Sequence, residues 1–137
     1  MYKTPTNKEI AALFSAIADS LEIRSVDEFR VRAYRNGARN IEGMDIDVAD
    51  ASSEGRLDLL PGIGPKLGIV IDEYVRTRSS QELDQAREGI PPGLFEVLRI
   101  RGLGPKTVGK VFEELKIEDL DSLERTAISG KLQSVPG

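Results

Sequence analysis

Residues 60–66 of the chain read LPGIGPK, and residues 100–106 read IRGLGPK. The two stretches share the pattern Gly-apolar-Gly-Pro-Lys at an offset of 40 residues. A partial third copy follows, because GKLQSVPG at residues 130–137 repeats the approach to the first turn, GRLDLLPG at residues 55–62. An internal repeat of this kind indicates that the chain is built from copies of one small structural unit.

Each glycine turn has the chemistry of a tight corner between two helices. In the first copy, Gly62 can adopt a left-handed backbone angle at little cost, and the apolar Ile63 can pack between the helices. Gly64 is expected at the N-cap, with Pro65 as the first helical residue, where its missing N–H costs nothing. The amides of Gly62, Gly64 and Lys66 would then lie at a helix N-terminus, which is a favourable site for an anion.

The second copy repeats this anion-binding chemistry with Gly102, Gly104, Lys106 and Thr107. The glycines allow a phosphate backbone to approach closely, and the lysines add positive charge. Such a site contacts phosphates and not bases, so its binding would be independent of sequence and sensitive to salt. The alternative is a plain helical corner without a ligand. The repetition of Pro-Lys after both turns favours the phosphate interpretation.

Apolar residues recur at three- and four-residue steps along most of the chain, which predicts helices. Thr6 and Glu9 have the spacing of a capping box before the first helix, and Ser79 and Glu82 have it before a later one. No segment keeps a period-two alternation, so the predicted fold class is all-α, a short helical bundle built around the two turns. The expected helices cover residues 7–21, 27–42, 47–53, 80–88, 93–99, 104–116 and, from Asp119 or Asp121, a last segment to residue 128.

The composition excludes several classes of protein. The chain has 137 residues, enough for one domain or two very small ones, and its hydrophobic fraction of 39% is sufficient for a folded core. It has no Cys and no His, which excludes disulfides, thiolate zinc sites, imidazole metal ligands and Ser-His-Asp triads. No apolar run reaches the roughly 18 residues of a membrane span, and no signal peptide is recognisable. We therefore expect a soluble, intracellular protein with no membrane partner.

Charge is distributed unevenly, although the net charge is only −4. Residues 24–39 contain five arginines against two acids, whereas residues 40–60 contain six acids against Arg56 alone. A local basic face can bind nucleic acid even in an acidic protein. A solvated helix surface is the alternative explanation for the arginine cluster.

The two turns look like helix-hairpin-helix motifs, and their order resembles that in the N-terminal region of X-family DNA polymerases of bacterial or archaeal type. Further stretches agree with that family: NKEI at residues 7–10, FRVRAYR at residues 29–35 and IPPGL at residues 90–94. The resemblance covers nearly the whole chain. It implies a lyase-type domain over residues 1–78 and a fingers-like subdomain over residues 79–137, truncated before a palm domain.

The resemblance implies a function in DNA repair. The first part would hold the downstream strand and its 5′-phosphate at a gap, and the second would grip duplex near the primer. We therefore expect sequence-independent binding of gapped, nicked or 5′-phosphate-bearing DNA by a cytoplasmic, nucleoid-associated monomer. The chain would be a piece of a DNA-directed DNA polymerase of base excision repair, whose catalytic palm with its Mg²⁺ follows outside these residues.

The phosphate pocket implied by the resemblance is only partly present. Arg30, Tyr34 and Lys66 match basic or hydroxyl-bearing positions, whereas Asp58 stands where a lysine is common. Some of these residues have a simpler interpretation, because Tyr34 lies on the apolar stripe of its helix and Arg30 could merely solvate the surface. Phe29 is expected in the core, with stacking on a template base as the alternative.

The resemblance also implies a monovalent cation, Na⁺ or K⁺, held between hairpin carbonyls and a DNA phosphate. No other cofactor is expected for this chain. The matching carbonyls are those of Asp58, Leu60 and Ile63 in the first hairpin and those of Leu98, Ile100 and Leu103 in the second.

No carboxylate cluster for polymerisation is predicted, although that chemistry needs acidic residues holding two metal ions. Two acidic pairs are present, Asp45 with Asp47 and Asp119 with Asp121. Neither follows the glycine-serine element of the family's palm, and a solvated helix start explains both. We therefore expect no catalytic residue and no nucleotidyl transfer within the chain.

The lyase reaction of the family would need a lysine amine one helical turn after Lys66, to form a Schiff base with the opened sugar. That position holds Val70, and the preceding acidic position holds Ile69. A lysine placed at position 70 is expected to face the sugar of a bound strand. Two alternatives stay open: 5′-deoxyribose-phosphate or abasic-site lyase activity supplied by Lys66 or another lysine, and a helical protein-interaction module whose turns serve packing only.

Overall fold

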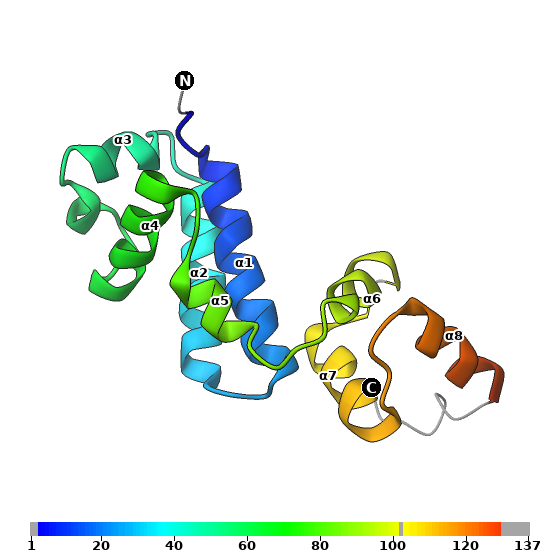
Figure 1. The fold of residues 1–137 in the computed structure, drawn as a ribbon. Helices are drawn as coiled ribbons and strands as arrows, with labels where there is room; N and C mark the ends of the chain where they lie inside the picture. Colours follow the sequence, from blue (N-terminus) through cyan, green and yellow to red (C-terminus); the bar gives the residue numbers. More distant parts are fainter. Residues whose placement is uncertain (1–2, 102, 130–137) are drawn as a thin grey trace. The chain divides into compact units, whose positions relative to one another are not determined.

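The computed structural model describes residues 3–101 and 103–129, without the side chains of residues 100, 101 and 126–129. The described residues form helices and connecting turns and contain no strand, so the all-α prediction is confirmed. None of the described helices is both long and apolar enough to cross a membrane. The partial third turn at residues 130–137 lies outside the described residues. In chain order the elements are α1 (Asn7–Ile23), α2 (Glu28–Glu42), α3 (Val48–Ser53), the short 3-10 helix η1 (Leu57–Leu59), α4 (Pro65–Thr77), α5 (Gln81–Ala86), α6 (Gly93–Arg101), α7 (Pro105–Leu115) and α8 (Leu120–Ser129) (Figure 1).

Side-chain caps form at the predicted starts of helices α1 and α3. The Thr6 Oγ1 accepts the backbone N–H of Glu9 at 3.1 Å, and the Glu9 carboxylate accepts the N–H of Thr6 at 3.0 Å. The predicted capping box is therefore present at α1. Asp47 caps α3 in a similar way, because its carboxylate accepts the N–H of Ala49 at 3.0 Å.

The cap of α5 differs from the prediction. Ser80, and not Ser79, accepts the N–H of Leu83 at 3.2 Å. The hydroxyl of Ser79 instead pairs with that of Thr77 at 2.9 Å. Ser80 is only 4% exposed, so tertiary packing fixes which of the two adjacent serines turns its hydroxyl toward the helix.

The chain divides into two compact units, each containing one glycine turn. The first unit consists of residues 1–18 and 29–86, and the second consists of residues 19–28 and 87–137. This division differs from the expected boundary between residues 78 and 79. In particular, residues 19–28 precede most of the first unit in the sequence and yet belong to the second.

The core of the first unit combines aliphatic residues with one aromatic pair. The rings of Phe14 and Tyr34 meet edge to face, with their centroids 5.2 Å apart. Gly37 lies against the same phenylalanine ring, since a Cβ on Gly37 would come within 2.9 Å of a Phe14 ring carbon. Helices α1 and α2 therefore pack closely at this point. Other buried side chains of this unit are those of Ile10, Ile17, Val31, Ile41, Val48, Leu67, Val70 and Ile71.

The second unit has a separate hydrophobic core. Two glycines of this unit lie close against the backbone of neighbouring segments. A Cβ on Gly109 would lie 2.3 Å from the carbonyl oxygen of Ile23, and a Cβ on Gly93 would lie 2.4 Å from that of Glu118. These two positions therefore require glycine for packing. The buried residues of this core are Ile23, Ile90, Leu94, Val97, Val108, Val111, Ile117 and Leu123.

Candidate nucleic-acid interface

The first glycine turn has the backbone geometry that its sequence predicts. Gly62 has a φ of 78°, in the left-handed region. Gly64 is the N-cap of α4 with an extended backbone (φ −83°, ψ −179°), and Pro65 is the first helical residue. Ile63 is 7% exposed, and its N–H donates to the Leu60 carbonyl at 3.3 Å. The turn therefore joins η1 to α4 with its apolar residue packed inward.

Asn40 of α2 fills the inner side of this turn, a contact that sequence reasoning missed. A Cβ built on Gly62 would lie 1.9 Å from the Asn40 Nδ2. Position 62 thus requires glycine for two reasons, its backbone angle and the space that Asn40 occupies. No signal in the sequence could reveal this contact, because the two residues meet only after α2 has packed in the first unit.

The outer side of the first turn is open. A Cβ built on Gly64 would meet nothing within 4 Å. No side chain forms a capping hydrogen bond at this N-terminus of α4, and Lys66 is exposed. The positive end of the α4 dipole therefore lies beside an accessible lysine, with open space next to Gly64.

The second turn repeats this geometry as far as it is described. Gly104 is the N-cap of α7, with φ −69° and ψ 157°, and is followed by a proline without a side-chain cap. A Cβ on Gly104 also meets nothing within 4 Å. Lys106 lies 3.6 Å from the carboxylate of Glu28, with both side chains largely in solvent, and Thr107 is half-buried. Gly102 lies outside the described residues.

Arg30 and Tyr34, both expected beside a phosphate, are engaged within the first unit. The Arg30 guanidinium forms an ion pair with the carboxylate of Glu82 on α5. Tyr34 is 4% exposed and packs on Phe14. Burial raises the pKa of the Tyr34 phenol above its ordinary value of 10.0. The core therefore accounts for Tyr34, which leaves little of its surface for a nucleic-acid strand.

Phe29 lies on the surface, in contrast to its expected place in the core. Its side chain is 75% exposed. The buried stripe of α2 contains Val31, Tyr34 and Ile41. Phe29 precedes this stripe by two residues, which places it about 200° away around the helix. The helical period therefore turns Phe29 away from the core.

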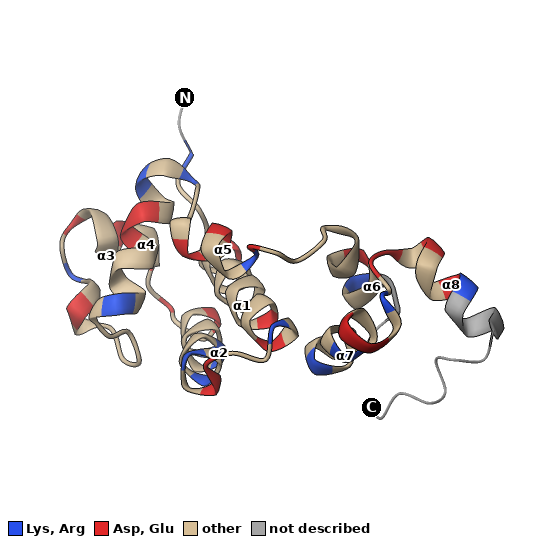
Figure 2. Ribbon diagram, turned by 60° about the horizontal axis from the view of Figure 1, so that its bottom comes forward, with Lys and Arg blue, Asp and Glu red and all other residues tan. Residues whose placement is uncertain are grey.

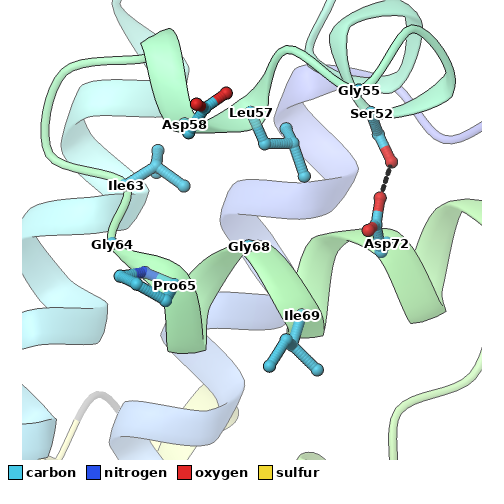
Figure 3. Close-up of a pocket in the computed structure, with 10 residues that line it drawn as sticks. All are labelled: Ser52, Gly55, Leu57, Asp58, Ile63, Gly64, Pro65, Gly68, Ile69 and Asp72. Atoms are coloured by element: carbon cyan, nitrogen blue, oxygen red, sulfur yellow. Dashed lines mark hydrogen bonds between the residues drawn. The ribbon is translucent and has the colours of Figure 1, made fainter.

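Helices α3 and α4, together with η1, enclose a pocket of about 410 Å³ beside the first turn (Figure 3). Asp58 and Ile69 both line this pocket, and they are two positions at which the chain departs from the lyase pattern. At one end of the pocket, the Ser52 hydroxyl donates a hydrogen bond to the Asp72 carboxylate. No lysine is among the described residues that line it.

Val70 does not face the open side of the hairpin. Its side chain is 6% exposed and belongs to the core, whereas Ile69 is 69% exposed. The buried face of α4 contains Leu67, Val70, Ile71 and Val75, which share one helical stripe. The expectation that a lysine at position 70 would face a bound sugar is therefore wrong, because its side chain would begin in the core.

One residue of each predicted acidic pair, Asp47 and Asp119, accepts a backbone hydrogen bond at the start of a helix. Asp47 caps α3, and Asp119 accepts the N–H of Ser122 at 2.8 Å just before α8. This backbone hydrogen bond from Ser122 lowers the pKa of the Asp119 carboxyl below its usual value. Within the described residues, no three His, Cys, Asp or Glu side chains are grouped so that they could hold a metal ion.

Comparison with known proteins agrees with this geometry. A family model of the helix-hairpin-helix domain matches residues 5–80, which is more than half of the chain. The chain belongs to the helix-hairpin-helix family. The match includes the first turn of this helix-hairpin-helix protein and ends before the second, so the likeness of the second hairpin to the first rests on its sequence and geometry.

A curated relative of this helix-hairpin-helix chain is the DNA polymerase/3′-5′ exonuclease PolX of Bacillus subtilis (strain 168). The two proteins are 31% identical over 130 residues, which cover 95% of this chain and 22% of the relative. The expected resemblance to X-family DNA polymerases of prokaryotes is thereby confirmed. The chain spans about a fifth of the length of this relative.

Proposed function

We propose that both hairpins bind phosphates of a DNA backbone without reading the bases. The observation that carries this proposal is the pair of open helix N-termini at Gly64 and Gly104, where no side chain forms a cap and a Cβ would meet nothing within 4 Å. A phosphate oxygen can approach such an N-terminus closely and accept hydrogen bonds from backbone amides. Lys66 and Lys106 follow these glycines and add positive charge that contacts phosphate at any sequence.

The preferred DNA in this proposal is gapped or nicked and carries a 5′-phosphate. Two phosphate-binding hairpins in one chain can contact the two strands that flank a break, whereas an intact duplex offers no strand end. The relationship to a protein named as a DNA polymerase supports DNA as the ligand. We further propose that the chain acts within an X-family polymerase during repair.

A binding assay with matched DNAs tests both parts of the proposal. Fluorescence anisotropy would compare a gapped duplex bearing a 5′-phosphate with an intact duplex of the same length over a series of salt concentrations. We expect tighter binding of the gapped duplex and a linear fall of log K with log salt. Equal affinity for the two DNAs would contradict the preference for gaps. An absence of binding at low salt would contradict DNA binding and favour the protein-interaction alternative.

We also propose a monovalent cation, Na⁺ or K⁺, at each hairpin. Carbonyl oxygens are suitable ligands for a hard cation, and the hairpins present several at their turns. Among the described residues, the Leu60 carbonyl accepts a long hydrogen bond from the Ile63 amide at 3.3 Å, and a carbonyl oxygen has a second lone pair for a further ligand. The proposed ligands are the carbonyls of Asp58, Leu60, Ile63, Leu98, Ile100 and Leu103. Replacing K⁺ by tetramethylammonium at constant ionic strength should weaken DNA binding if this cation bridges protein and phosphate.

We propose that the chain does not act as a lyase. Two observations support this: Val70 occupies the nucleophile position and is 6% exposed, and the neighbouring pocket is lined by Asp58 and Ile69. An amine is required to form the Schiff base. Borohydride trapping on a 5′-deoxyribose-phosphate substrate is the test, and a robust covalent adduct would favour the lyase alternative with Lys66 or another lysine as the nucleophile.

A further inference from the structure

The pocket between α3, η1 and α4 has a largely apolar lining and borders the proposed phosphate site at Gly64. Its volume is about 410 Å³, which can take one or two side chains. Leu57, Ile63, Pro65 and Ile69 contribute apolar surface to it (Figure 3). We call this feature the α3–α4 groove.

Gly68 opens the side of the groove formed by α4. A glycine inside a helix costs about 1 kcal/mol relative to alanine. The close packing seen at Gly109 does not explain Gly68, because a Cβ here would meet only Leu57, at an ordinary distance of 3.9 Å. The space above Gly68 is therefore available to a ligand.

A large apolar side chain in the groove lining is exposed to solvent. Ile69, which lines the groove, is 69% exposed. Single exposed apolar residues are ordinary on protein surfaces, but apolar residues gathered around a hollow mark a surface for interaction. An apolar side chain from another molecule would cover Ile69 and displace water from the groove.

The charge around the groove determines the class of partner. Asp58 and Asp72 lie toward opposite ends of the groove (Figure 3). Acidic residues are also present elsewhere on α3 and α4 (Figure 2), and residues 40–60 contain six acids against Arg56. Arg56 is paired with Glu54 at 3.1 Å. These carboxylates attract cationic groups toward the groove.

We propose that the α3–α4 groove docks a short segment of a partner protein, in which one apolar side chain is flanked on both sides by arginine or lysine. The apolar side chain would enter the groove over Gly68, and the two cationic groups would contact Asp58 and Asp72. This docking does not require DNA binding at the hairpins, so the two proposals can fail separately.

A peptide titration followed by NMR tests the groove. The probe is a short peptide with a central leucine between two arginines, added to the ¹⁵N-labelled chain. We expect saturable shifts at Gly55, Gly64, Gly68, Ile69 and Asp72. Replacing the leucine of the peptide by serine, or both arginines by glutamate, should weaken binding about fivefold or more.

Matched variants of the protein separate the groove from its acidic surroundings. Gly68→Leu fills the groove and Asp58→Lys reverses the charge at one end, so each should weaken peptide binding about fivefold or more. Gly68→Ala adds only a methyl group in ordinary contact, and Asp45→Lys reverses an exposed charge outside the groove. These two controls should stay within about twofold of the wild type.

Three results would overturn the docking proposal. The first is a titration without saturable shifts in the wild type. The second is equal weakening by Asp45→Lys and Asp58→Lys, which would indicate nonspecific charge attraction. The third is the same set of shifts caused by a single-stranded oligonucleotide, which would assign the groove to nucleic acid. Circular dichroism of each variant would show that the helical fold is retained in the comparison.

Discussion

Replacing Gly62 by alanine should destabilise the first unit, whereas the same change at Gly64 should not. Gly62 has a φ of 78°, and an L-residue in the left-handed region costs about 1–2 kcal/mol. The new Cβ would also lie 1.9 Å from the Asn40 Nδ2, so the amide would have to rotate away. At Gly64 the φ is −83° and a Cβ meets nothing within 4 Å. We therefore expect a loss of about 1–2 kcal/mol for Gly62→Ala and a change within about 0.5 kcal/mol for Gly64→Ala.

For DNA affinity the order of the two variants should reverse, so that Gly64→Ala has the larger effect. Gly64→Ala adds a methyl group to the open face that a phosphate would approach, so we expect its affinity for DNA to fall by about 1 kcal/mol, roughly fivefold. Urea unfolding followed by circular dichroism would give the stability, provided that the slope m is unchanged. Anisotropy at fixed salt would give the DNA affinity.

A double variant separates the two causes of the Gly62→Ala loss. In the Gly62→Ala variant, the additional change Asn40→Ala removes the clash and leaves the backbone strain. The double variant should therefore recover only part of the stability that Gly62→Ala loses. Gly64→Ala would refute this account if it lowered stability more than Gly62→Ala. The assignment of strain to position 62 would also be refuted if Gly62→Ala unfolded at the same urea concentration as the wild type.

Further variants address the core, the first cap and the phosphate contact. Val70→Lys would start a charged side chain in the core and should lower the free energy of unfolding by about 2–4 kcal/mol in urea, while Ile69→Lys should stay within about 0.5 kcal/mol. The hydrogen bond from the Thr6 backbone lowers the pKa of Glu9 below its ordinary value of 4.5, so its stabilisation is present above that pH and is lost as the pH falls through the lowered value. Glu9→Gln should therefore reduce the acid sensitivity of stability below about pH 4.5, measured by urea unfolding at a series of pH values. Lys66→Ala should weaken DNA binding by about 1 kcal/mol and reduce the slope of log K against log salt by about one in salt titrations.

Local signals in the sequence were sufficient for most helices and for the turns. The Thr6 and Glu9 pair lies where a capping box requires it, and the first turn has a left-handed Gly62 followed by an N-cap at Gly64. These features depend on backbone angles and hydrogen bonds between residues close in the chain. Such interactions can be inferred from residue types and spacing alone.

Features that depend on tertiary packing could not be inferred in this way. The burial of Val70 follows from which stripe of α4 meets the rest of the first unit, and the resemblance to a lyase gave the opposite orientation. The Asn40 contact with Gly62 and the ion pair of Arg30 with Glu82 likewise require the folded unit. The pocket near Asp58 is also assembled by packing, so the set of residues that line it could be recognised only from the structure.

Residues 19–28 belong to the second unit but lie between the two segments of the first unit, and this has a consequence for synthesis on the ribosome. Ile23 belongs to the second core, but its partners Val108 and Val111 are translated only after the whole of the first unit. The first unit has all its residues once residue 86 has emerged and can fold while translation continues. The second core must instead close a long segment of chain, and such non-local closure slows folding because chain entropy is lost before the contacts form. We therefore expect the N-terminal hairpin to fold before the second one.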